Sequence, residues 1–214
     1  MSPRYSLPLL AALLAFALPV QAAIVINEVD YDQPGTDTAE FIELKNTGPV
    51  AVNLQNYKVE LVNGNLGGAA VYQTITLPSF SLAVGAYYVI SGNSSLVPFT
   101  NLVVTPATNL IQNGPPDAIG LRDPISILRD AVSYEGNTGA PYTETSGTLL
   151  VDDGSNVYAS LSRFPDGADT DNNNLDFSLR CASPGSPNVA TSGTCGNPVP
   201  THSATWGQIK TIYR

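Results

Sequence analysis

Short runs of alternating or β-branched residues dominate the pattern of apolar and polar positions from residue 23 to residue 164. Gly, Pro and Asn separate these runs, and no stretch keeps the 3.6-residue period of a helix. We predict strands at 23–29, 40–46, 57–62, 71–77, 86–91, 117–123, 127–134 and 157–164. Many short strands with such turns are typical of an all-β fold, an antiparallel sandwich or barrel with almost no helix.

The segment EFIELKN, residues 40–46, shows the alternation most clearly. Successive side chains of a strand point to opposite faces, so Ile42 and Leu44 share one face and Glu43 and Lys45 share the other. A strand that is buried on one face only has this pattern. We therefore expect Ile42 and Leu44 in the core and Glu43 in solvent.

The N-terminal residues predict export. Arg4 precedes an apolar run, Leu7 to Val20, which ends in the small-x-small sequence Val-Gln-Ala. The run is shorter than the roughly 20 apolar residues that cross a bilayer. We interpret residues 1–22 as a signal peptide cleaved after Ala22, with an uncleaved anchor as the alternative. The exported chain has no second run of that length, so we expect it to be secreted or held at the cell envelope without a membrane span.

The rest of the chain divides into a predicted domain, residues 23–190, and an irregular linker and tail, residues 191–214. In the tail, Trp206, Ile209 and Tyr213 have the spacing of one helix face. We predict that residues 201–214 are a detachable docking or sorting segment; a frayed chain end is the alternative.

The two cysteines, Cys181 and Cys195, are an even number in a chain that we expect to be exported. An oxidising compartment then favours one disulfide between them, and two free thiols are the alternative. The net charge of −9 disfavours nucleic acid, whose binding depends on Lys and Arg contacts to phosphate. It allows cations and basic partners.

Few residues suggest catalysis. The only histidine, His202, lies in the predicted tail, which makes a Ser-His-Asp site very improbable. Two carboxylates can run glycoside hydrolysis, and Glu28, Asp30, Glu40 and Glu43 are available for that reaction. Carboxylates on the surface of strands are the commoner explanation.

The segment DGADTDNNNLD, residues 166–176, is the sharpest candidate for metal binding. Asp169, Asp171 and Asn173 alternate and Asp176 follows, so their oxygens could wrap a calcium ion in a tight loop. The pattern is partial, because Arg180 stands where an EF-hand loop has its last ligand. An Asx-rich turn without metal is the alternative. Calcium is the one cofactor that the sequence suggests.

Several motifs in order resemble the lamin tail domain of bacterial proteins. They are IVINEVDYDQPGTDTAEFIELKN followed by NLQNY, then LPSFSLAVGAYYVI, DAIGLRDPISILRDAVSY, SLSRFPDGADTDNNNLDFSL and SPGSPN, so that the resemblance covers roughly residues 24–188. It implies an immunoglobulin-like β-sandwich. It also implies that Glu28, Glu40 and Glu43 are motif positions of a non-enzymatic module, where they pair strands or bind the first loop.

From the residues and the resemblance together we expect a secreted or cell-surface, non-catalytic binding or structural module whose partner is a protein or an envelope component. An accessory domain that presents a secreted hydrolase or nuclease to its substrate is the second hypothesis. A carboxylate-dependent hydrolase is the third.

Overall fold

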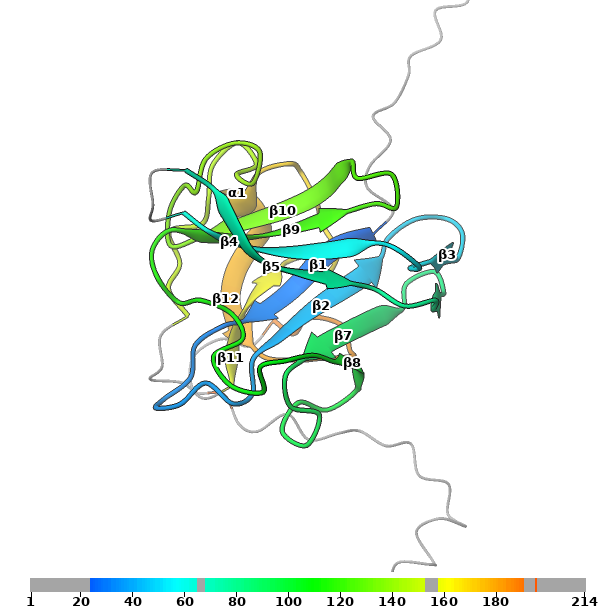
Figure 1. Ribbon diagram of the computed structural model, residues 1–214, viewed down its shortest axis with the longest axis horizontal. Coiled ribbons are helices and arrows are strands. Elements are labelled where there is room, and N and C mark those ends of the chain that lie inside the picture. Colours follow the sequence, from blue (N-terminus) through cyan, green and yellow to red (C-terminus); the bar gives the residue numbers. More distant parts are fainter. Residues whose placement is uncertain (1–23, 65–67, 153–157, 191–194, 196–214) are drawn as a thin grey trace, which may run out of the picture.

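A computed structural model describes residues 24–64, 68–152, 158–190 and 195 (Figure 1). The predicted signal peptide, its cleavage site after Ala22 and the predicted tail segment, residues 201–214, lie outside the described residues. No helix in the described part of the chain is long and apolar enough to cross a membrane.

The larger sheet has six strands in the order β12–β11–β1–β2–β7–β8. Neighbouring strands are antiparallel except β7 and β8, which are parallel. The strands are β1 (Ile24–Asp30), β2 (Phe41–Asn46), β7 (Tyr87–Ser91), β8 (Thr100–Val103), β11 (Ala159–Arg163) and β12 (Phe177–Cys181). The first strand of the domain therefore lies in the middle of this sheet, between β2 and β11.

The second sheet has four antiparallel strands in the order β10–β9–β4–β5. They are β4 (Lys58–Asn63), β5 (Ala70–Thr76), β9 (Asp117–Arg122) and β10 (Leu128–Tyr134). A two-stranded sheet of β3 (Val52–Asn53) and β6 (Ser81–Leu82) lies at one end of the domain, and one short helix, α1 (Asn173–Asp176), precedes β12 (Figure 1).

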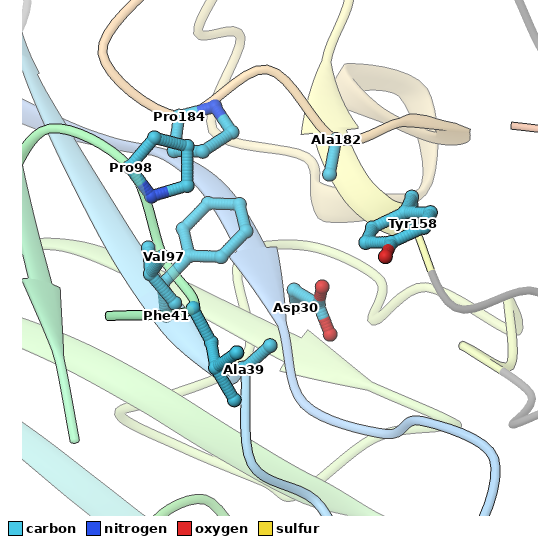
Figure 2. Close-up of a pocket in the computed structure, with 9 residues that line it drawn as sticks. Asp30, Ala39, Phe41, Val97, Pro98, Tyr158, Ala182 and Pro184 are labelled. Atoms are coloured by element: carbon cyan, nitrogen blue, oxygen red, sulfur yellow. The ribbon is translucent and has the colours of Figure 1, made fainter. Parts of the chain in front are cut away.

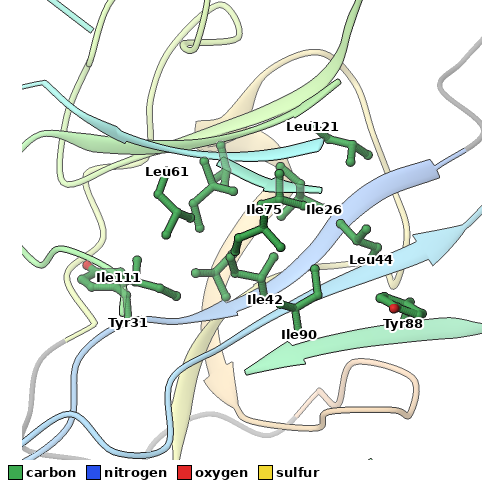
Figure 3. Close-up of a cluster of buried hydrophobic side chains, with 14 of the residues drawn as sticks. Ile26, Tyr31, Ile42, Leu44, Leu61, Ile75, Tyr88, Ile90, Ile111 and Leu121 are labelled. Atoms are coloured by element: carbon green, nitrogen blue, oxygen red, sulfur yellow. The ribbon is translucent and has the colours of Figure 1, made fainter. Parts of the chain in front are cut away.

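The core lies between the two larger sheets (Figure 3). Ile26, Ile42 and Leu44 come from the six-stranded sheet, and Leu61 and Leu121 come from the four-stranded sheet. All of these side chains are fully buried. The arrangement is a sandwich, one of the two all-β folds that the many short strands predict and the one that the resemblance implies.

The sequence-based strand predictions agree with the structure to within about two residues at each end. The pattern missed β3 and β6, which have two residues each, and β8, in which Asn101 interrupts the apolar run. It also missed β12, although Phe177 and Leu179 alternate with polar residues there. Pairing with β11, rather than intrinsic pattern, fixes that last strand.

One prediction about exposure is wrong. Glu43 does point away from Ile42 and Leu44, but it is 0 % exposed. The segments that follow β11 and β12 cover the outer face of β1 and β2, so this face is not in solvent. The strand pattern reveals on which face a side chain lies but not what covers that face.

The predicted disulfide is confirmed. Cys181 at the end of β12 and Cys195 are joined, with their Cα atoms 5.2 Å apart. The cross-link therefore ties the last strand of the sandwich to a residue beyond the end of the predicted domain.

Candidate functional site

A bulge in β1 places two consecutive polar residues on the outer face of the six-stranded sheet. The register with β2 shifts between Ile26 and Glu28, so Asn27 is the extra residue. Ile26 and Val29 still reach the core, and Asn27 and Glu28 both make their contacts on the other face. Regular alternation would have put one of the two among apolar side chains.

Glu28 lies between two hydroxyl-bearing neighbours and the segment after β12. Ser160 of β11 donates a hydrogen bond of 2.6 Å to its Oε1 atom, and the backbone N–H of Ser183 donates one of 2.8 Å to the same atom. Burial raises the pKa of Glu28 to about 7, although these hydrogen bonds act in the opposite direction.

Glu43 stands opposite Glu28 on the neighbouring strand and binds the same covering segment. The backbone N–H of Gly185 donates to its Oε2 atom at 2.6 Å, and Asn27 donates to its Oε1 atom at 2.9 Å. Burial, and then the charge of Glu28, raise the pKa of Glu43 well above its usual range. We call residues 183–188 the covering loop, because its backbone closes over both glutamates.

Two features fix the path of the covering loop. Gly185 has φ +77°, and a Cβ atom there would lie 2.6 Å from Cβ of Phe99, so the position requires glycine. Asn188 donates from its Nδ2 atom to the carbonyl groups of Asn27 and Arg163. The loop is thereby held at both ends and shields Glu28 and Glu43 from water.

Glu40 also accepts hydrogen bonds from backbone N–H groups of a loop, here the connection between β8 and β9. Its two oxygens accept hydrogen bonds of 2.6 and 2.9 Å from the consecutive N–H groups of Leu110 and Ile111. It is 3 % exposed, and burial raises its pKa to about 7. Glu40 therefore anchors the long connection between β8 and β9 to the start of β2.

A buried arginine, Arg163 at the end of β11, is the centre of a carboxylate cluster. Nη2 donates to Asp130 at 2.8 Å, Nη1 donates to Asp176 at 2.9 Å, and Nε donates to the carbonyl of Ile26 at 2.8 Å. The guanidinium carbon lies 4.6 Å from the centre of the Phe177 ring. This cation–π contact and the ion pairs connect β11 with β1, β10 and α1.

The four predicted calcium ligands do not converge on one point: each makes hydrogen bonds to other groups of the protein or faces solvent. Asp169 and Asp176 both accept hydrogen bonds from Arg163, and Asp171 is exposed, with φ +56°. Asn173 pairs with the edge of β10: it accepts from the N–H of Ser133 and donates to the carbonyl of Ala131. These contacts favour the Asx-rich turn, and calcium binding stays a prediction.

Within the described ranges, three carboxylates whose oxygens lie within 4.8 Å of one another are those of Asp130, Glu144 and Asp169. The guanidinium of Arg163 lies 3.9 Å from Glu144 and 3.3 Å from Asp169. The side chain of Arg163 therefore supplies positive charge to this group of carboxylates.

Asp30 has a different setting, at the floor of a small apolar pocket (Figure 2). The pocket lies over the ends of β1 and β2, and its free volume is about 10 Å³, room for about one water molecule. Tyr158 lies on one side of Asp30, with its hydroxyl oxygen on the near edge of the ring (Figure 2). The apolar walls are Ala39, Phe41, Val97, Pro98, Ala182 and Pro184.

The sequence of residues 19–136 matches the profile of the Lamin Tail Domain family, over more than half of the chain. The chain belongs to the lamin tail domain family. No curated protein matches it. The resemblance noted in the motifs is confirmed through β10; the matched range ends before β11, α1 and β12, which complete the six-stranded sheet.

Family membership and the sandwich together support a non-catalytic immunoglobulin-like module for binding or structure. The lamin tail motifs I-N-E and E-F-I-E-L contain the three glutamates that hold loops in this structure, Glu28, Glu40 and Glu43. These side chains bind backbone groups of the fold, but the loops are the one after β12 and the one between β8 and β9, not the first loop that the resemblance implied.

Sequence reasoning did not find the role of Arg163 or the pocket at Asp30. A signal existed for Arg163, because a charged residue follows Ala159, Leu161 and two serines in an otherwise uncharged strand. The pocket had no comparable signal, since the residues that line it come from five separate segments of the chain.

Proposed function

We propose that this lamin tail domain is an exported, non-catalytic module that binds a protein or envelope partner at or outside the cell surface. The observation that carries the proposal is how the protein uses three of the four candidate catalytic carboxylates; the fourth, Asp30, lines the small pocket. Glu28, Glu40 and Glu43 are at most 3 % exposed, and each accepts hydrogen bonds from the backbone of a loop. A general acid or nucleophile must reach its substrate, and these groups are covered by the protein itself.

The disulfide supports export. Cytosolic thiols are kept reduced, whereas a stable cross-link such as Cys181–Cys195 is typical of proteins that fold outside the cytosol. The negative net charge supports a partner that is neutral or basic rather than nucleic acid. The predicted signal peptide, an independent part of the sequence, also supports export.

The experiment combines localisation with an activity screen. Cells that make the chain with a tag inserted after the predicted cleavage site are fractionated, and intact cells are treated with a protease that cannot enter them. We expect the protein in the envelope or the medium, cleaved after Ala22, with no activity on glycoside, phosphomonoester or phosphodiester substrates.

Comparing the parent protein with one variant makes the activity screen decisive. Glu43→Gln keeps a hydrogen-bond acceptor for Gly185 but removes the charge, so it should fold and behave as the parent protein does. Hydrolysis by the parent that disappears in Glu43→Gln would establish a carboxylate-dependent enzyme instead. Accumulation inside the cell with two free thiols would overturn export.

A further inference from the structure

Among the residues that the structure describes, one oxygen of the Asp30 carboxylate has no hydrogen-bond donor. Gln33 donates to Oδ1 at 2.6 Å, and no donor of the described residues reaches Oδ2. Asp30 is 2 % exposed, and its side chain lines the pocket (Figure 2). A carboxylate oxygen that borders a pocket and has no protein donor can complete its hydrogen bonds with a ligand or a water molecule.

The charges that act most strongly on Asp30 are all of one sign. They belong to Asp152, Glu28 and Glu40, and each is negative. The salt bridges among the described residues involve other carboxylates, so no Lys or Arg of this part of the chain neutralises Asp30. The missing positive charge must come from another molecule or from a bound proton.

The shape of the pocket limits what can enter it. The free volume of about 10 Å³ admits a group the size of water, which excludes a guanidinium, a sugar ring or an aromatic ring. Phe41, Val97 and Pro98 line it with apolar surface, and Leu96, which also lines it, is 51 % exposed. The narrow end of the pocket, with its one carboxylate, complements an ammonium group. The apolar lining complements the chain of methylenes that carries this ammonium group.

We propose that this pocket binds the ammonium group of a lysine side chain carried by a partner protein. The ammonium pairs with Asp30 and the hydroxyl of Tyr158 offers it a second acceptor, while the methylenes lie against Leu96 and Phe41. Their apolar contact would add to the ion pair, which is screened by salt only weakly because Asp30 is buried. This inference rests on the proposed binding function and names the chemistry that the module recognises.

Proton release should accompany binding. Burial, and then the charge of Asp152, raise the pKa of Asp30 well above its usual range, so the carboxyl group in the free pocket keeps its proton to a higher pH than an exposed aspartate does. A cation favours the ionised carboxylate and displaces that proton. The ionisable groups that surround Asp30 are Asp152, Glu28, Glu40 and Tyr158, and the first three carry charge of the same sign.

The test is a titration of the purified exported protein with Nα-acetyl-lysine amide, followed by ¹H–¹⁵N NMR and by calorimetry in two buffers of different ionisation enthalpy. We expect saturable shifts at Ala39, Val97 and Ala182, release of protons, and weaker binding as the pH falls. Nα-acetyl-norleucine amide, which has the same methylenes without the ammonium, should leave these signals unchanged.

Asp30→Asn is the decisive variant, because it keeps the shape of the pocket and the acceptor for Gln33 but removes the charge. It should fold as the parent does and bind the lysine probe at least about tenfold more weakly. Glu43→Gln, a buried carboxylate of the same sheet outside the pocket, should retain binding. Equal shifts with the norleucine probe, or equal affinity in Asp30→Asn, would overturn the lysine assignment. Since the titration uses purified protein, that outcome would leave export and the lack of catalysis standing.

Discussion

Glu28 illustrates how a buried carboxyl group makes stability depend on pH. Its pKa rises from 4.5 to about 7 on folding because the side chain is removed from water. Between these values the folded protein holds more protons than the unfolded chain, so the free energy of unfolding falls as the pH rises. Glu40 and Glu43 act in the same direction, since burial raises the pKa of each.

We therefore expect the parent protein to be more stable at about pH 5 than at about pH 8 in urea unfolding. Glu28→Gln should flatten this dependence by an amount of up to about 3 kcal/mol, the size of its pKa change. Glu60→Gln, which removes a partly buried carboxylate paired with Arg122, is the control. A profile of Glu28→Gln that is as steep as that of the parent would contradict this account.

Arg163 is the residue whose removal should cost the most stability. Arg163→Met keeps much of the apolar stem but leaves Asp130 and Asp176 buried without their counter-charge. Removing one partner of a buried pair costs about 3–5 kcal/mol. Arg129→Met is the control, because the Arg129 side chain is 46 % exposed, although that of its partner Asp123 is only 7 % exposed. There we expect less than about 1 kcal/mol. Equal losses in the two variants would refute a special role for Arg163.

At the scale of single elements, the loop before α1 and α1 itself contain the residues that we predict to bind calcium. If Asp169, Asp171, Asn173 and Asp176 do rearrange around Ca²⁺, millimolar Ca²⁺ should raise the melting temperature, and Asp171→Ala should abolish the rise. Asp171 is suited to this test because it is exposed, so its loss should hardly affect the apo protein. An unchanged melting temperature would leave the Asx-rich turn as the whole role of the segment.

The covering loop can be tested at Gly185. Gly185→Ala puts a Cβ atom 2.6 Å from Phe99 in a left-handed conformation, so we expect a loss of more than about 1–3 kcal/mol and faster hydrogen exchange at residues 183–188. Gly35→Ala separates the two effects, because Gly35 has φ +95° and open space around it. It should show the backbone strain alone. If both variants lose the same amount, the contact with Phe99 does not matter.

Strands could be read from the sequence more readily than the site. The spacing of Ile42 and Leu44 follows from the pleat of one strand, so a local pattern suffices to place them in the core. Burial of Glu43 depends on Gly185, which lies 142 residues further along the chain. The same applies to Asp30, whose pocket includes Val97 and Pro184. Local periodicity contains no information on such distant contacts.

At the scale of the whole molecule, the disulfide and the covering loop are coupled, because the disulfide restricts the segment that contains the loop. The covering loop, residues 183–188, lies inside the segment closed by Cys181 and Cys195, which are 14 residues apart. The cross-link thus limits the freedom of the segment that shields Glu28 and Glu43. A loop of this length is worth about 3 kcal/mol through the entropy of the unfolded chain.

We expect reduction to lower the free energy of unfolding by about that amount and to speed hydrogen exchange at the N–H groups of Ser183 and Gly185, which donate to the two glutamates. Water that then reaches Glu28 and Glu43 should lower their pKa values, so the reduced protein should lose part of its pH-dependence as well. The double variant Cys181→Ser, Cys195→Ser should match the reduced parent and be insensitive to reductant. If reduction changes stability but leaves exchange at the covering loop and the pH profile as they were, the disulfide acts only on the unfolded chain, and its link to the buried carboxylates is refuted.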